Sequence, residues 1–251
     1  MNAPLVAATV LACLLVAEWL GMRMGRWLPE HHLAADTRDT VKLATGLVAT
    51  MAALLLGLLV SSAKQSHDGR RNQVIQMAAK IAFLDRVLVV YGPEAAEARA
   101  KFRLAIEEAV QRLWHADVEM LARASPGNPT GDAAYAALES LSPRDEAQGT
   151  LKGRATDLAI EIGELRALLH AQSTRSISIP MLIVMVCWLA VIFVSFSLLA
   201  PLNATAQVAL LIAALSVSGA IFLILELDEP FGGSIRLSSQ PIVNAFSQMG
   251  N

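Results

Sequence analysis

The sequence predicts an all-α integral membrane protein in which four transmembrane helices are continuous with an antiparallel helical bundle outside the bilayer. Two observations support this fold class. Four apolar runs of about 20 residues lie at 4–22, 43–63, 177–200 and 204–227, and none carries a charge near its centre. Most charged residues lie instead between positions 64 and 175. Because a bilayer accepts only backbones whose polar groups bond internally, each run must be a helix.

The apolar runs come in two closely spaced pairs and divide the chain into four parts. These parts are a first transmembrane pair at 1–63, a helical extramembrane domain at 64–176, a second transmembrane pair at 177–228 and a C-terminal tail at 229–251. A signal peptide has basic residues before its apolar segment, and the first run has none. We therefore expect this run to be retained as an anchor.

The distribution of basic residues indicates the orientation. With four spans, both termini and the 64–176 domain lie on one side of the membrane. The basic residues near the membrane on that side are Lys64, Arg70, Arg71, Lys80, Arg166, Arg175 and Arg236. Those on the other side are Arg23, Arg26, Arg38 and Lys42. The larger group favours a cytoplasmic domain in a multi-pass protein of the inner (plasma) membrane, whereas the two arginines directly after the first span favour the reverse.

The composition narrows the possible partners. Hydrophobic residues make up 55% of the chain, more than in ordinary soluble domains, so the lipid bilayer is the first expected partner. The formal net charge of −2 gives no basic surface for nucleic acid. The two cysteines, Cys13 and Cys187, lie inside predicted spans, which argues against a disulfide framework and for a packing role.

The middle of the chain has the apolar spacing of helices. The second span should continue as one helix to Tyr91, where Gly92 and Pro93 stop it. A following helix should begin at Pro93 and run to about 124, before a loop at 125–131. A short helix at 132–141 and a longer one, with Ser142 as its N-cap, should lead to the third span.

The sequence contains no catalytic motif. No His-x-x-x-His pair, Cys-x-x-Cys pair, P-loop or Gly-x-Ser-x-Gly pattern occurs, so we expect no enzyme, no catalytic residue and no cofactor. His31 and His32 are adjacent in the first loop, where an interfacial loop is the expected structure and a metal site the alternative.

A stripe of small and hydroxyl-bearing residues runs along one face of the second span at three- and four-residue spacing. Its members are Gly46, Thr50, Ala53, Gly57 and Ser61. One interpretation is that another helix packs closely on this face. The other is that copies of the helix surround a pore, whose basic mouth at Lys64, Arg70 and Arg71 concentrates anions.

Charged residues lie at the ends of the spans in two sets. Glu18, near the end of the first span, and Lys42, at the start of the second, either pair at the membrane boundary or extend separately to the interface. Glu226, Asp228 and Glu229 end the last span. These acids either form an interfacial stop that pairs with nearby bases or provide oxygen ligands for a cation.

Two segments carry a resemblance to a known family. The helix from Leu54 to Arg86, which passes through Ser-His-Asp-Gly-Arg-Arg, resembles the second helix of bestrophins. The Glu-Leu-Asp-Glu-Pro-Phe-Gly-Gly sequence after the last span is similar to the Asp-Pro-Phe-Gly exit of their last helix. With the paired spans and the Ile-Arg-Leu-Ser-Ser segment at 235–239, nearly the whole chain resembles the bestrophin-like membrane proteins of bacteria and plants.

The resemblance implies a homo-oligomer, pentameric by analogy, in which the second helices line the path of an inorganic ion. Bestrophins are permeable to chloride in animals and to cations in some bacteria, so selectivity does not transfer. The residues Gly233 to Arg236 stand where the family's calcium clasp has acids, which argues against calcium gating. The second span also lacks the phenylalanines that narrow bestrophin pores. A hydrophobic constriction would come from Leu54, Leu55, Leu56, Leu58 and Leu59.

Two functions follow from these observations. The first is a homo-oligomeric ion channel of bestrophin-like architecture, favoured by the stripe that leads into a basic mouth. The alternative is a non-conducting oligomeric scaffold or sensor whose helical domain binds a partner, favoured by the absence of a charge within the central part of any span.

Overall fold

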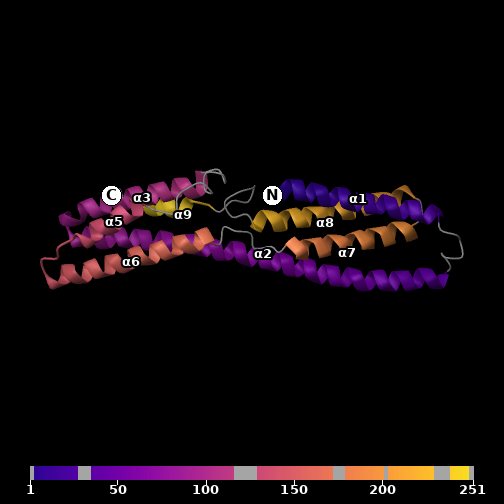
Figure 1. The fold of residues 1–251 in the computed structure, drawn as a ribbon, viewed down its shortest axis with the longest axis horizontal. Coiled ribbons are helices and arrows are strands. Elements are labelled where there is room, and N and C mark those ends of the chain that lie inside the picture. The colour runs from indigo at the N-terminus through magenta and orange to yellow at the C-terminus, as the bar shows by residue number, and fades with distance from the viewer. Residues whose placement is uncertain are drawn as a thin grey trace. The chain divides into compact units, whose positions relative to one another are not determined.

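The computed structural model describes residues 3–27, 35–115, 129–171, 179–200, 203–228 and 238–248. Every regular element in these ranges is helical, as the sequence predicts. The described chain divides into two units (Figure 1). The membrane unit comprises 1–67 and 175–235, and the helical unit comprises 68–174 and 236–251.

The four predicted spans are confirmed as helices. They are α1 (Ala3–Trp27), the first part of α2 (Ala35–Tyr91), α7 (Ile179–Leu199) and α8 (Ala204–Asp228). Each is long and apolar enough to cross a membrane. The loop with His31 and His32 lies outside the described residues.

Within the membrane unit, α1 packs along both α7 and α8 (Figure 1). The core includes Leu14, Met185 and Ile221, which are fully or almost fully buried. A buried hydrogen bond joins two of the helices, because the Ser218 hydroxyl donates to the Ala7 carbonyl oxygen at 2.8 Å. A buried hydroxyl needs such a partner, so this contact fixes the register of α8 against α1.

The helical unit contains the second part of α2, then η2 (Pro93–Ala95), α3 (Ala96–His115), α5 (Pro129–Glu139), α6 (Glu146–Ala171) and α9 (Gln240–Gln248). The predicted stop at Gly92 is confirmed, because α2 ends at Tyr91 and Gly92 has a φ of 120° that side chains rarely adopt. A single 3₁₀ turn then precedes α3, so the α-helix begins at Ala96, three residues after the predicted start at Pro93. The predicted extension of this helix to 124 lies outside the described residues.

Two predicted boundaries are wrong. Pro129, Thr130 and Gly131 form the first turn of α5 and do not belong to a loop. The N-cap of α6 is Asp145 and not Ser142, because the Asp145 carboxylate accepts a hydrogen bond from the Gln148 N–H at 2.7 Å. The Gln148 side chain also accepts from the Arg144 N–H, so the cap is closed from both directions.

Ion pairs join α2 to its neighbours in the helical unit. The Arg99 guanidinium of α3 binds both carboxylate oxygens of the buried Asp85, with the Nη2–Oδ2 distance at 2.9 Å. This hydrogen-bonded carboxylate raises the pKa of Arg99. Lys80 bonds Glu161 of α6, and this contact lowers the pKa of the Glu161 carboxyl.

Candidate functional site

The first part of α2 has one packed side and one open side. Thr45, Ala52, Leu59 and Ala63 are buried and follow one another at spacings of seven, seven and four residues. This spacing keeps them on one face of a helix. Leu59 and Ala63 belong to the core of the membrane unit. The rest of the circumference is therefore free for lipid, another subunit or a pore.

All five residues of the predicted stripe lie on the open side. Gly46, Thr50, Ala53, Gly57 and Ser61 are each exposed. A Cβ atom added to Gly46 or to Gly57 would meet no atom within 4 Å. No other described helix of the same chain therefore packs closely against either glycine, and a close-packed partner for the stripe would have to come from another subunit.

The five leucines of the predicted constriction separate into two groups. Leu54 and Leu58 are 71% and 64% exposed, and they lie one turn apart on the open side. Leu59 is 4% exposed and belongs to the core, while Leu55 and Leu56 pack against it. Only Leu54 and Leu58 are thus positioned to narrow an opening formed by the outward faces of several α2 helices.

The Thr50 hydroxyl is already bonded within its own helix. It donates to the Leu47 carbonyl oxygen at 2.7 Å. Because a hydroxyl has one proton and two lone pairs, the group directs a methyl and acceptor lone pairs outward but no donor.

The predicted basic mouth is not uniform. Lys64 and Arg71 are exposed and stand seven residues apart on α2, so they share a helical face. Arg70 is 3% exposed. Its neighbours keep it from the surface, so the exposed positive charge in this stretch comes from Lys64 and Arg71.

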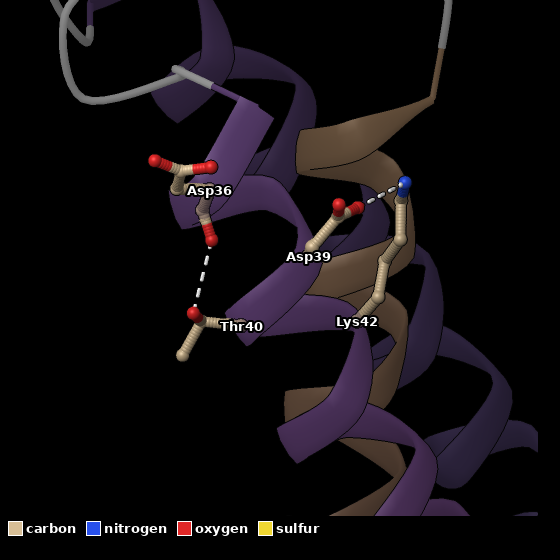
Figure 2. Close-up of polar contacts among 4 residues, drawn as sticks. All are labelled: Asp36, Asp39, Thr40 and Lys42. Carbon is tan, nitrogen blue, oxygen red and sulfur yellow. Dashed lines mark hydrogen bonds and ion pairs between the residues drawn. The ribbon is translucent and has the colours of Figure 1, made fainter.

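The charges at the start of α2 pair with each other (Figure 2). The Lys42 ammonium nitrogen lies 3.0 Å from Asp39 Oδ1, and the Thr40 hydroxyl donates to the Asp36 carbonyl oxygen at 2.9 Å. Glu18 is 6% exposed on the packed face of α1. The structure does not bring Glu18 and Lys42 together, and their pairing stays a prediction.

The acidic exit of α8 is buried. Glu226 and Asp228 have almost no exposed surface, and each has a polar partner. Glu229 lies outside the described residues. Within the described ranges, no three His, Cys, Asp or Glu side chains lie close enough together to hold a metal ion. The cation site at this exit stays a prediction.

Within the described part of the chain, close helix packing at a small residue occurs on α1. A Cβ atom on Gly21 would lie 2.5 Å from the Val194 carbonyl oxygen and 2.8 Å from Ser197 Cβ, so only glycine lets α1 approach α7 this closely. Ala17, Gly21 and Gly25 are spaced four residues apart, which is a small-residue motif for helix pairing. This spacing was the signal in the sequence that could have located the contact.

The four apolar helices and the helical unit define a polytopic α-helical membrane protein. A profile of the Bestrophin-like domain matches residues 11–242. The chain therefore belongs to the Bestrophin-like family, as its resemblance implied. No curated protein matches the sequence.

Several solved structures share the fold. A variant of a bacterial bestrophin homologue from Klebsiella pneumoniae has 15% identity and a TM-score of 0.72, with 97% of this chain and 99% of that chain covered. A variant described as a membrane protein has 14% identity and a TM-score of 0.72, with 97% and 98% covered. The Klebsiella pneumoniae homologue solved by zinc phasing has 14% identity and a TM-score of 0.67, with 95% and 97% covered. These likenesses confirm the bestrophin-like, all-α architecture.

Proposed function

We propose that the chain forms a homo-oligomeric ion channel of the inner (plasma) membrane, pentameric by analogy, with α2 of each subunit lining a central pore and the helical unit in the cytoplasm. The known members of the Bestrophin-like fold are ion channels, which supports this proposal. No enzymatic activity is part of it.

The observation that carries the proposal is the open side of α2. A helix that lines a water-filled path needs a face that makes no close contacts with the rest of its own chain. The exposed stripe from Gly46 to Ser61 meets this requirement, with open space over both of its glycines. The exposed Leu54 and Leu58 would form the hydrophobic narrowing.

The polar groups of the same helix suggest how ions would be treated. Lys64 and Arg71 would raise the local concentration of anions at one end of the path. A ring of Thr50 side chains would present lone pairs and methyl groups, because each hydroxyl proton is already donated to the Leu47 carbonyl oxygen of its own helix. The ring would therefore add no hydrogen-bond donor for an anion, and net selectivity would reflect the balance of the two regions.

The first test is ionic current from the purified protein in planar bilayers under an asymmetric salt gradient. Thr50→Trp should abolish the current without disrupting the oligomer, because each subunit would add an indole to the path. Thr9→Trp is a matched control, since Thr9 is also exposed in a span and donates to a carbonyl of its own helix, at 2.8 Å. Wild-type current in an assembled Thr50→Trp protein would refute the assignment of the pore face.

A second test asks which part of the open side of α2 faces the path. In a background without Cys13 and Cys187, single cysteines are placed at Gly57 and at Leu47, which shares a helical face with Leu54, and are treated with a charged thiol reagent. Block at Gly57, with or without block at Leu47, supports the stripe as part of the pore face. Block at Leu47 alone would assign the path to the side of Leu47 and Leu54 and would refute the stripe. Absence of current from the wild type across voltage, pH and calcium would support the scaffold or sensor instead.

A further inference from the structure

The outward face of α1 ends in a ladder of three residues, Trp19, Arg23 and Trp27, spaced one turn apart. The Arg23 Cζ atom lies 5.6 Å from the centre of the Trp19 ring and 5.4 Å from the centre of the Trp27 ring. All three side chains are exposed. They lie opposite the buried face of the helix, which includes Leu14 and Gly21.

The two indoles hold the guanidinium in place and leave its edge available. Both distances are within the range of cation–π interactions, which engage the faces of the indole rings. The edge of a guanidinium carries five N–H donors in a plane that matches two oxygens of a phosphate. No described carboxylate lies within ion-pair distance of Arg23, so the guanidinium has no competing acid among these residues.

The surroundings of the ladder favour a ligand with both an anionic head and an apolar body. Towards the middle of the span, the exposed side chains on the same side of α1 are apolar and include Val16 and Leu20. Indoles favour the boundary between hydrocarbon and water, and Arg26 adds a second positive charge nearby. Charge complementarity and this apolar approach point to a phospholipid.

We propose that Trp19, Arg23 and Trp27 form a binding site for the phosphate of an anionic phospholipid headgroup. The guanidinium binds the phosphate oxygens, the indoles flank the headgroup, and the acyl chains lie along Val16 and Leu20. This site is independent of whether the protein conducts ions.

The test uses the full-length protein in detergent with Trp114→Phe and Trp188→Phe, so that Trp19 and Trp27 are the only two of the four tryptophans left. Phosphatidylglycerol or phosphatidylcholine with bromine atoms near the headgroup is added, and tryptophan quenching is measured. We expect phosphatidylglycerol to reach half-maximal quenching at a lower mole fraction than phosphatidylcholine does. Arg23→Gln should weaken the binding of phosphatidylglycerol roughly tenfold, which is the scale of one charge-assisted hydrogen bond, and should change the binding of phosphatidylcholine little.

Arg26→Gln is the matched control, because it removes the same charge from the same helix without touching the ladder. If Arg23→Gln and Arg26→Gln weaken phosphatidylglycerol binding equally, the proposal is overturned, because general surface charge would then explain the binding. Equal quenching by both lipids in the two-tryptophan protein with Arg23 intact would overturn headgroup recognition. No quenching by either lipid would mean that a second copy of the chain covers the ladder. Displacement of phosphatidylglycerol by excess inorganic phosphate would assign the site to free phosphate instead.

Discussion

Replacement of Gly21 by alanine should destabilise the protein, although alanine is the better helix former. In a helix interior, alanine is favoured over glycine by roughly 0.5–1 kcal/mol. The new Cβ atom would lie 2.5 Å from the Val194 carbonyl oxygen, a backbone atom that cannot move without moving α7. Overpacking of this kind costs about 1–3 kcal/mol. The net loss is therefore about 0–2.5 kcal/mol, and its midpoint of about 1.2 kcal/mol corresponds to a melting temperature lowered by roughly 2–5 °C.

The assay is thermal unfolding of the purified protein, followed by the loss of its monodisperse size-exclusion peak. Gly25→Ala is the matched control on the same helix, because its Cβ atom would lie 3.5 Å from the Leu198 carbonyl oxygen, an ordinary contact. Gly153→Ala on α6 would meet no atom within 4 Å and should be neutral or stabilising. If Gly21→Ala melts at or above the temperature of Gly153→Ala, the reasoning from the α1–α7 contact is wrong.

Three further changes test other parts of the structure. Gly57→Ala should leave the oligomer as stable as the wild type if the stripe lines a pore, and a loss of oligomer on size exclusion would show close packing between subunits. Arg99→Met should leave the buried Asp85 carboxylate without its ion pair and destabilise the helical unit by about 2–4 kcal/mol, measured as faster amide exchange in α3. A double variant with Asp85→Leu should recover most of this loss, whereas simple addition of the two losses would contradict the pairing. Glu161→Gln should lower the melting temperature near neutral pH but not in acid. Lys80 lowers the pKa of Glu161, so the ion pair stabilises the fold fully above the ordinary carboxyl pKa and loses its effect as the pH falls through the lowered pKa of Glu161. A difference in melting temperature between wild type and Glu161→Gln that stays the same at every pH would contradict this ion pair.

The helices could be predicted because their signals are local. An apolar run of about 20 residues identifies a span, and a glycine followed by a proline identifies the end of α2. The cap of α6 was harder, since Ser142 and Asp145 are both good N-caps and only the hydrogen bond to Gln148 decides between them. The short helix α9 was missed, because its nine residues follow a segment with strong turn composition.

The candidate site could be predicted only in part, because exposure depends on the other helices. The spacing of the stripe located a distinctive face of α2, but spacing alone could not say whether Gly57 or Gly21 lies against a neighbour. The same limit applied to the leucines, since Leu58 and Leu59 are adjacent in sequence and differ only in which side of the helix they occupy. Arg70 and Arg71 differ for the same reason.

The position of α9 has a consequence for the order in which the protein folds. Ile242 and Ala245 of α9 are buried with Val74, Ile81 and Leu169 in one apolar cluster of the helical unit. Between Leu169 and Ile242 in the chain lie both α7 and α8. A ribosome therefore completes the second pair of membrane spans before it makes the segment that closes this cluster. Until then the apolar side chains of α2 and α6 in this cluster remain partly uncovered, so the helical unit can be completed only after both later spans have been synthesised.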